Sequence, residues 1–189
     1  GRKSVAQNAR GQVVTHAYDA ASRLTARIYP NGDRHTFAYD AASQRIWMND
    51  PTGVTTFTYD AAGRRAAQVS SFGQTITYEF DPAGRRERMI DPRNKRFTYT
   101  YDPAGQLTRL INPRAERTTI SYDPLGRITL RQTAGGVTSQ VYDEVGNLTE
   151  VQNFRGLDTP VSHFTYTYDR ASHRATSVDQ ASTRTTWTY

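Results

Sequence analysis

Apolar and polar residues alternate along many short segments of this chain. In the segment 96–101, which reads Arg-Phe-Thr-Tyr-Thr-Tyr, every second residue is aromatic and the residues between are threonine or arginine. Such alternation is typical of a β-strand with one buried face, and Thr, Tyr, Phe and Ile all favour strands. No stretch keeps the 3.6-residue period of an amphipathic helix, so we predict an all-β protein. The alternation recurs at 37–39, 57–59, 76–80, 120–122, 164–168 and 187–189.

Each alternating segment ends on an aromatic residue that is followed by aspartate. Successive aromatic residues are 21, 20, 21, 21, 21, 20, 26 and 21 positions apart, and the last residue, Tyr189, stands where another copy would begin. A fixed period of this length indicates a chain built from repeated supersecondary units. The copies are Tyr18-Asp19, Tyr39-Asp40, Tyr59-Asp60, Phe80-Asp81, Tyr101-Asp102, Tyr122-Asp123, Tyr142-Asp143 and Tyr168-Asp169.

The aspartate of each copy begins a tight turn. In Asp102-Pro103-Ala104-Gly105, Asp can accept from a nearby backbone N–H, Pro sets φ and Gly takes the left-handed conformation, which predicts a type I turn with a Gly bulge. Serine replaces this glycine at Ser22, Ser43 and Ser172, so we expect those turns to differ locally. The other copies carry Gly63-Arg64, Gly84-Arg85, Gly105, Gly126-Arg127 and Gly146.

A second, looser turn signal lies about eleven residues past the Asp, for example at Tyr29-Pro30-Asn31-Gly32 and Asn112-Pro113-Arg114. Each period therefore holds two turns and two short segments, which together make a β-hairpin. The hairpins predict about sixteen or seventeen strands in one continuous antiparallel meander. At ~4.8 Å between strands the strip would be roughly 75–80 Å wide. A sheet of this width curls, so we expect a curved single-layer strip, arc or spiral.

The composition suits a sheet with one apolar face better than a solid core. Hydrophobic residues make up 36% of the chain, and the mean hydropathy is -0.74. No composition shift divides the 189 residues, so we expect a single repeat array, 1–189, with a partial repeat at 1–17 and about eight repeats over 18–189. We also expect a fragment of a longer chain, whose targeting signals lie elsewhere. Cysteine is absent, and no apolar run approaches the ~18 residues of a membrane span.

One interval is longer than the others. Between Tyr142 and Tyr168 the period stretches to 26 residues, and we expect the extra residues in a loop at 153–160. Loops carry binding residues more often than strands do, so Phe154, Arg155 and Asp158 are candidates for a binding loop. The sequence favours the other interpretation, an insertion tolerated at a hairpin tip.

The strings Tyr59-Asp60-Ala61-Ala62-Gly63-Arg64 and Tyr122-Asp123-Pro124-Leu125-Gly126-Arg127 resemble the YD repeats of the Rhs family. Related arrays occur in bacterial Rhs polymorphic toxins, in the C components of bacterial ABC toxin complexes and in the extracellular teneurins. The resemblance implies a β-strip that spirals into a hollow shell, which encloses a toxic domain in bacterial relatives and serves adhesion in animal ones.

The same resemblance implies partners and a location. The partners are flanking repeats of the same parent chain and an enclosed toxin domain, and the location is secreted or on the bacterial cell surface. Bacterial arrays end in a core segment with an Asp-dependent self-cleavage site. The sequence after Tyr168 contains no such segment, so no catalytic residue is carried across.

The sequence contains no motif that indicates a catalytic, metal-binding or cofactor-binding site. The repeated Asp residues already have a turn-capping role. The four histidines, His16, His35, His163 and His173, lack the spacing or the Cys partner of a zinc site, although His16 and His35 could approach on adjacent strands. There is no Gly-x-Ser-x-Gly elbow and no Gly-rich phosphate loop. We therefore predict a protein that is not an enzyme and binds no cofactor.

The charge leaves two interpretations open. The net charge is +6, and the basic groups at 64–65, 85–88 and 93–96 come from consecutive repeats. Aligned into a stripe, they could bind nucleic acid or acidic glycans. The sequence favours the alternative, in which these residues pair with Asp and Glu across strands.

Three functional hypotheses follow from the sequence. The favoured one is a structural segment of a shell that encloses a toxin or other polypeptide. The alternative is a surface adhesion or glycan-binding module of a bacterial cell-wall-associated protein. A weaker third is self-association through open sheet edges.

Overall fold

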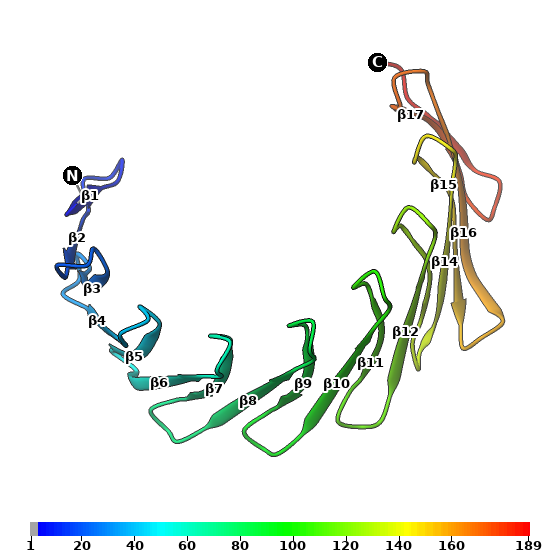
Figure 1. Ribbon diagram of the computed structural model, residues 1–189. Coiled ribbons are helices and arrows are strands. Elements are labelled where there is room, and N and C mark those ends of the chain that lie inside the picture. The colour runs from blue at the N-terminus through cyan, green and yellow to red at the C-terminus, as the bar shows by residue number, and fades with distance from the viewer. Residues whose placement is uncertain (1–3) are drawn as a thin grey trace. The chain divides into compact units, whose positions relative to one another are not determined.

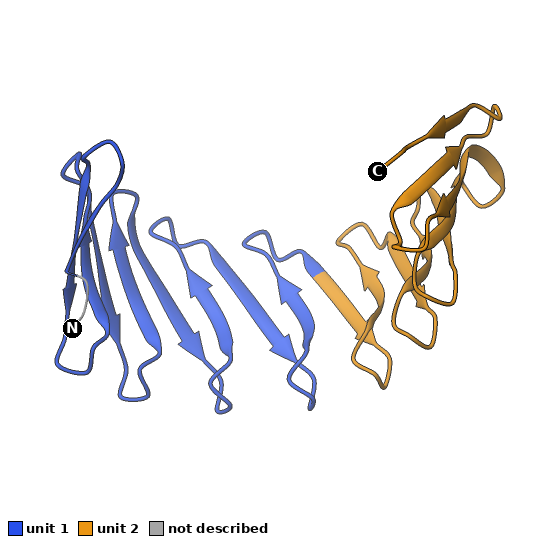
Figure 2. Cartoon of the chain, turned by 90° about the horizontal axis from the view of Figure 1, so that it is seen from above, with its two compact units in different colours: residues 1–96 blue, residues 97–189 orange. Residues whose placement is uncertain are grey.

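The structure is a computed structural model that describes residues 4–189. The chain divides into two compact units, unit 1 (residues 1–96) and unit 2 (residues 97–189) (Figure 2). The described residues contain eighteen strands and no helix, so the predicted all-β class is confirmed. The strand count exceeds the expected sixteen or seventeen because short strands form at both ends of the described chain. No helix among the described residues is long and apolar enough to cross a membrane.

Unit 1 is an antiparallel meander in which each strand pairs with the next along the chain. Its hairpins follow one another in a single layer (Figure 1). The strands are β1 (Val5–Gln7), β2 (Val13–Tyr18), β3 (Leu24–Ile28), β4 (Arg34–Tyr39), β5 (Arg45–Asp50), β6 (Gly53–Tyr59), β7 (Arg65–Val69), β8 (Thr75–Phe80) and β9 (Arg86–Ile90).

Unit 2 is a meander of the same kind, and its first strand begins at Arg96, the last residue of unit 1. The predicted hairpin repeat is thus confirmed in both units. The strands are β10 (Arg96–Tyr101), β11 (Leu107–Ile111), β12 (Arg117–Tyr122), β13 (Ile128–Gln132), β14 (Gly136–Tyr142), β15 (Leu148–Arg155), β16 (Thr159–Tyr168), β17 (Arg174–Val178) and β18 (Arg184–Thr186).

Every hairpin closed by an aromatic-Asp pair has the same turn. In the turn after β6, Asp60 N–H donates to Arg64 O and Gly63 N–H donates to Asp60 O, both at 2.9 Å. Gly63 has φ of 77°, and the β6–β7 register shifts by one residue between Thr58 and Tyr59. This is the predicted turn with a bulge, because a left-handed residue adds one position to one strand.

The three serine turns do not differ, contrary to the expectation. Ser22, Ser43 and Ser172 take φ of 72°, 62° and 63° and keep the same two backbone hydrogen bonds as the glycine turns. A left-handed L-residue costs about 1–2 kcal/mol. The shared hydrogen bonds of the turn and its Asp cap offset that cost, so serine accepts the strained conformation.

Very little of the described chain is buried. Ala26 and Phe57 are the only buried hydrophobic residues there, each 5% exposed. A single layer cannot shield both of its faces, so most strand side chains remain half-buried. The stability of each unit must therefore come largely from contacts along the sheet between neighbouring strands.

The long interval is mostly strand rather than loop, which corrects the expected loop at 153–160. β15 extends to Arg155 and β16 begins at Thr159, so only three residues form the tip. Polar side chains hold the extension together, since Thr138 Oγ1 donates to Asn153 Oδ1 at 2.8 Å and Asn153 Nδ2 donates to Ser162 Oγ at 2.9 Å. Asn153 and Ser162 are residue types common in loops, but here their side chains form hydrogen bonds between neighbouring strands.

Candidate functional site: the turns that join successive repeats

The aspartate of each aromatic-Asp pair is the centre of its turn. Asp60 Oδ1 accepts from the backbone N–H groups of Ala62 and Arg64, at 3.0 and 2.9 Å. Its second oxygen, Oδ2, lies 2.7 Å from Arg64 Nε. One carboxylate thus caps the turn and also fixes the direction of the arginine side chain. The same ion pair forms in Asp19–Arg23, Asp81–Arg85 and Asp123–Arg127.

The arginine held in this way reaches the next repeat. Arg64 Nη1 donates to the backbone oxygen of Asp81 at 3.3 Å, and its Cζ lies 4.7 Å from the centre of the Phe80 ring. We call this arrangement the turn latch: the Asp of one turn, the Arg four residues on, and the aromatic-Asp pair of the following turn.

The turn latch occurs in both units. In unit 1, Arg23 donates to Asp40 O at 2.9 Å and lies 5.2 Å from the Tyr39 ring. In unit 2, Arg127 donates to Asp143 O at 3.1 Å and lies 4.7 Å from the Tyr142 ring. Copies with the same geometry in separate units indicate a property of the repeat itself.

Tyrosine hydroxyls make the reciprocal contact, back to the preceding hairpin. Tyr59 donates its hydroxyl to Arg45 O at 2.7 Å. Because the acceptor is a backbone oxygen, the bond does not depend on the side chain there. Phe80 has no hydroxyl and cannot make this bond, although the Arg64 guanidinium still packs over its ring. The same hydroxyl bond forms in Tyr39–Leu24, Tyr122–Leu107 and Tyr168–Leu148.

The turn contacts lower the pKa of several of the capping carboxylates. The pKa of Asp60 is below its ordinary value of 3.8, chiefly because its oxygen accepts from the Arg64 backbone N–H, and also because of the Arg64 side chain. For Asp81 and Asp123, burial opposes the shift, but the backbone and side chain of the following arginine outweigh it and the pKa is still lowered. Asp143 and Asp169 show the same direction.

Some repeats carry a different residue in the arginine position. Gln44 Nε2 donates to Gly63 O at 3.1 Å and so still joins two turns, without a charge. Asn147 Nδ2 donates to Asp143 Oδ2 at 2.9 Å, and His173 Nδ1 lies 3.0 Å from Asp169 Oδ2. The Asn147 and His173 side chains are shorter than arginine, and each contacts the capping aspartate of its own turn.

A second set of arginines packs on aromatic rings. Arg45 Cζ lies 5.6 Å from the Phe37 ring centre and 5.0 Å from that of Phe57, and Arg65 lies 4.7 Å from Phe57. The contact recurs at Arg86 with Tyr78 and at Arg174 with Tyr166. Guanidinium groups thus cover aromatic faces that would be apolar surface in an uncovered sheet.

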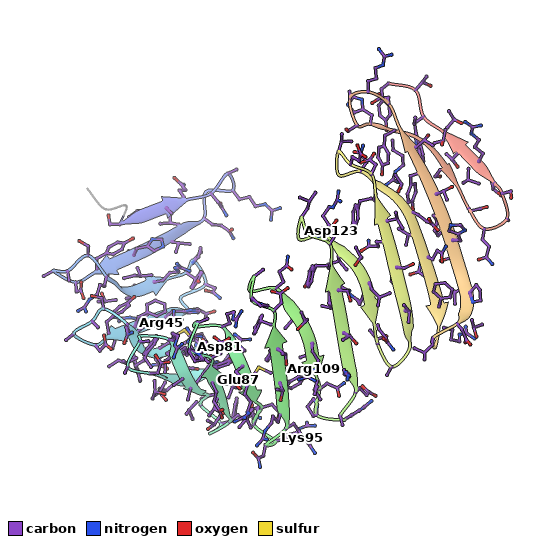
Figure 3. The ribbon with its side chains drawn as sticks, turned by 45° about the vertical axis from the view of Figure 1, so that its right-hand side comes forward. Arg45, Asp81, Glu87, Lys95, Arg109 and Asp123 are labelled. Carbon is purple, nitrogen blue, oxygen red and sulfur yellow. The ribbon has the colours of Figure 1, made fainter. Side chains whose placement is uncertain are left out.

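The basic groups at 64–65, 85–88 and 93–96 do not form a single stripe in the described part of unit 1, which was the interpretation that the sequence did not favour. Residues 64–65 and 85–86 follow the aromatic-Asp turns, whereas Lys95 lies in a turn at the opposite end of its hairpin from Asp81 (Figure 3). Several guanidiniums are also engaged, as in Arg88, which pairs with Glu79 on the adjacent strand. This arrangement agrees with the cross-strand pairing that the sequence favoured.

The predicted binding residues separate. Phe154 lines a pocket of about 220 Å³ together with Asn153, Pro160, Ser162 and His163. Gln152 and Gln180, from β15 and from the turn after β17, complete the lining. Arg155 is the last residue of β15 and Asp158 lies in the tip, and neither lines the pocket. The sequence did not identify Gln152, Ser162, His163 and Gln180, because they lie outside the expected loop and meet Phe154 only when β15, β16 and the turn after β17 come together.

The histidines do not gather into a site. His16 and His35 both face Arg27, which lies on the strand between theirs, so they are not on adjacent strands as the sequence allowed. Within residues 4–189, no group of three His, Cys, Asp or Glu side chains is placed to hold a metal ion.

Comparison with known proteins points to one kind of fold. The family model described as teneurin YD-shell matches residues 1–119 and, overlapping them, residues 73–189. The TcdB2-TccC3-TEV crystal structure aligns with 95% of this chain and 11% of its own, at 18% identity and a TM-score of 0.76. The TcdB2-TccC3 crystal structure also aligns with 95% of this chain and 11% of its own, at 18% identity and a TM-score of 0.75.

A third match is the Photorhabdus luminescens Tc holotoxin pore with a TccC3 mutation, at 16% identity and a TM-score of 0.68. It covers 88% of this chain and 12% of that one. The chain therefore spans 11 to 12% of the length of the solved chains it matches. No curated protein sequence matches the chain.

Proposed function

Because this chain belongs to the teneurin YD-shell family, we propose that it is a non-catalytic segment of shell wall that helps to enclose a polypeptide. The turn latch is the observation that carries this proposal. At Arg23, Arg64 and Arg127 it ties one hairpin to the next through an ion pair, a hydrogen bond and a ring contact. These contacts serve the mechanical continuity of the sheet rather than any reaction.

The lack of a conventional core explains why such ties matter. A repeat that buries almost no apolar surface gains little stability alone, and its neighbours supply the rest. A wall one layer thick must also resist bending at every hairpin boundary. The latch meets both needs, because the arginine is fixed at one end by its own turn and at the other by the next.

The proposal extends to organisation and partners. Residues 1–189 would form one repeat array, partial at 1–17, and the aromatic-Asp-Gly-Arg residues would serve as its structural motif. The partners would be flanking repeats of the parent chain and an enclosed toxin domain. The location would be outside the cell, either secreted or at the cell surface, as the name Tc holotoxin pore suggests for one relative.

Protease protection in the parent protein tests the proposal. The parent protein is incubated with trypsin under native conditions, and the surviving fragments are identified by mass spectrometry over time. We expect a segment outside the repeats to survive until the wall opens. Replacing Arg23, Arg64 and Arg127 with alanine should expose it sooner.

The matched control is Arg114→Ala, at an exposed position in the other row of turns. This variant should leave protection of the segment unchanged. Cleavage of every segment outside the repeats at the rate of an unfolded tail, in both the parent protein and the latch variant, would contradict enclosure.

A further inference from the structure

Three arginines of unit 1 occupy the same register position in consecutive repeats. Arg45, Arg65 and Arg86 are the first residues of β5, β7 and β9, and we call them the arginine row. Each lies opposite the aromatic residue that closes its hairpin, which is Tyr39, Tyr59 or Phe80. The other repeats carry an apolar residue at this position, apart from Arg174 in β17: Leu24, Leu107, Ile128 and Leu148. Three successive charges at an otherwise apolar position are therefore a local feature of unit 1.

Aromatic rings place the arginine row on one face of the sheet. Phe57 lies between Arg45 Cζ and Arg65 Cζ, whose distances from the ring centre are 5.0 and 4.7 Å. Arg86 Cζ lies 4.8 Å from the centre of the Tyr78 ring. The two rings share a face, because the register that joins β6 to β8 through β7 places Phe57 in line with the residue two positions before Tyr78.

The spacing of the arginine row follows from the sheet. β6 separates β5 from β7, and β8 separates β7 from β9. Successive arginines are thus two strands apart, or about 9.6 Å at the usual strand spacing. The row therefore presents one cation about every 10 Å in a direction that crosses the strands.

A pocket of about 300 Å³ lies between two members of the row. Among the described residues, its lining is aromatic and cationic, without a carboxylate: Tyr59, Arg65, Tyr78, Phe80 and Arg86. In the part of the chain that the structure describes, no Asp or Glu forms an ion pair with Arg45 or Arg65. A guanidinium that contacts a ring can still donate its N–H groups to a carboxylate. The row is therefore complementary in charge to an acidic partner.

The surroundings of the row favour a polypeptide over a nucleic acid. A nucleic-acid strand carries a phosphate about every 3.4 Å along a duplex axis, roughly three times as densely as the row carries cations. Both methionines of the chain lie on the same face, since Met48 pairs with Phe37 and Met89 pairs with Tyr78. Adaptable apolar surface of this kind suits a polypeptide whose acidic residues are separated by apolar ones.

We propose that the arginine row binds an extended acidic polypeptide, whose carboxylates lie one beside each guanidinium and whose intervening residues contact the rings and the pocket between Arg65 and Arg86. A polyproline II segment with an acid at every third position meets this requirement, because its carboxylates lie on one side about 9.3 Å apart. Bound carboxylates also remove the mutual repulsion of the three cations. The inference does not depend on enclosure, because it concerns one face of unit 1 and not what the wall surrounds.

Peptide binding to the intact chain tests the proposal. The probe is fluorescein-labelled Glu-Pro-Pro-Glu-Pro-Pro-Glu, followed by fluorescence polarisation at about 50 mM salt, where screening is weaker than at physiological salt. Arg65→Leu removes the middle cation and should lower the affinity about tenfold. Leucine occupies the equivalent position in other repeats, such as Leu107, so the variant should melt at the temperature of the parent or above it.

The matched control is Arg174→Leu, which removes the same charge from the same register position outside the row. This variant should bind the peptide within about twofold of the parent. A second control uses the unmodified chain and the peptide Glu-Glu-Glu-Pro-Pro-Pro-Pro, which has the same composition but clusters its charges. It should bind at least about fivefold more weakly, because its carboxylates cannot reach successive arginines.

Four results would overturn the proposal. They are no binding of the spaced peptide at about 1 mM, equal binding of the spaced and clustered peptides, equal losses in Arg65→Leu and Arg174→Leu, and tighter binding of a labelled oligothymidylate that Arg65→Leu weakens. The last would identify a nucleic-acid surface instead.

Discussion

The arginine of the turn latch combines three contacts that are each modest. Exposed ion pairs contribute about 0–1 kcal/mol, and a guanidinium over an exposed ring contributes about 0.5–1 kcal/mol. The Arg64 and Asp60 side chains keep 32% and 26% of their surface exposed, so solvent weakens their attraction. All three contacts are made by the same arginine side chain. The conformational entropy lost by ordering that side chain is therefore a single cost shared by the three contacts.

Removal of this side chain should measure the latch. We expect Arg64→Ala to lower the free energy of unfolding by about 1–2 kcal/mol, measured by urea denaturation. The control is Arg114→Ala, where only the backbone N–H has a defined partner, Asn112 Oδ1. Equal losses in the two variants would show that the latch adds nothing beyond an ordinary surface arginine.

The capping aspartates make stability depend on pH. The pKa of Asp60 in the folded chain is below the ordinary value of 3.8, chiefly because of the Arg64 backbone N–H. The pKa is lowered in the same direction at Asp19, Asp81, Asp123, Asp143 and Asp169. The unfolded chain therefore takes up protons first as pH falls, and the stability present above about pH 4 is lost below it. We expect the melting temperature to be level near neutral pH and to drop below about pH 4.

Asp60→Asn removes the negative charge of the side chain but keeps an oxygen that can accept the backbone hydrogen bonds of the turn. Asn112 shows that an amide can cap such a turn, since its Oδ1 accepts from the backbone N–H of Arg114 and Glu116. The variant should therefore fold and show a shallower loss of stability in acid. An acid limb as steep as that of the parent would mean that Asp60 titrates alike in the folded and unfolded chain.

At the level of the element, local sequence patterns were sufficient for most of the fold. Alternation identified strands such as β10, and the Asp-x-x-Gly string identified the turns. The local pattern was insufficient in the segment 153–160, because Asn153 belongs to a residue type that favours turns and becomes a strand residue only by pairing with Ser162 on β16. The latch was equally hidden, because Arg64 and Phe80 meet only after two hairpins stack.

Serine and glycine in equivalent turns allow the strain to be measured. Ser22→Gly should raise the free energy of unfolding by about 0.5–1 kcal/mol, since φ of 72° suits glycine. Gly84→Ala should lower it by about 1 kcal/mol through φ of 81° alone, because the nearest atom to an added Cβ is 3.7 Å away. Chemical denaturation provides both values, and two changes of the same sign would refute the strain argument.

The pairing of β14 with the far end of β15 depends on Gly136, the first residue of β14. A Cβ on Gly136 would lie 2.1 Å from the backbone oxygen of Phe154, so Gly136→Ala must separate β14 from β15. We expect a loss of about 1–3 kcal/mol and faster amide exchange at 151–155. Gly135→Ala is the control, since its nearest atom is 3.9 Å away. A tolerated Gly136→Ala would mean that the ladder near Arg155 forms in another register.

At the level of the whole molecule, the scarcity of buried residues limits how far a local change can act. A globular domain spreads a defect through its core, but each hairpin here contacts chiefly the strands before and after it. Stability in such a chain is approximately a sum of repeat terms and nearest-neighbour terms. The turn latch belongs to the nearest-neighbour terms, because Arg64 joins the turn after β6 to the turn after β8.

Hydrogen exchange of Arg64→Ala should show that limited range. We expect faster amide exchange from β6 to β9, on either side of the broken latch, and unchanged exchange in the β2–β3 hairpin, where Arg23 keeps its own latch. The opposite pattern, an equal increase in every strand, would indicate a single cooperative unit. Loosening confined to β6–β9 would support the proposal that each latch stabilises only the two hairpins it joins.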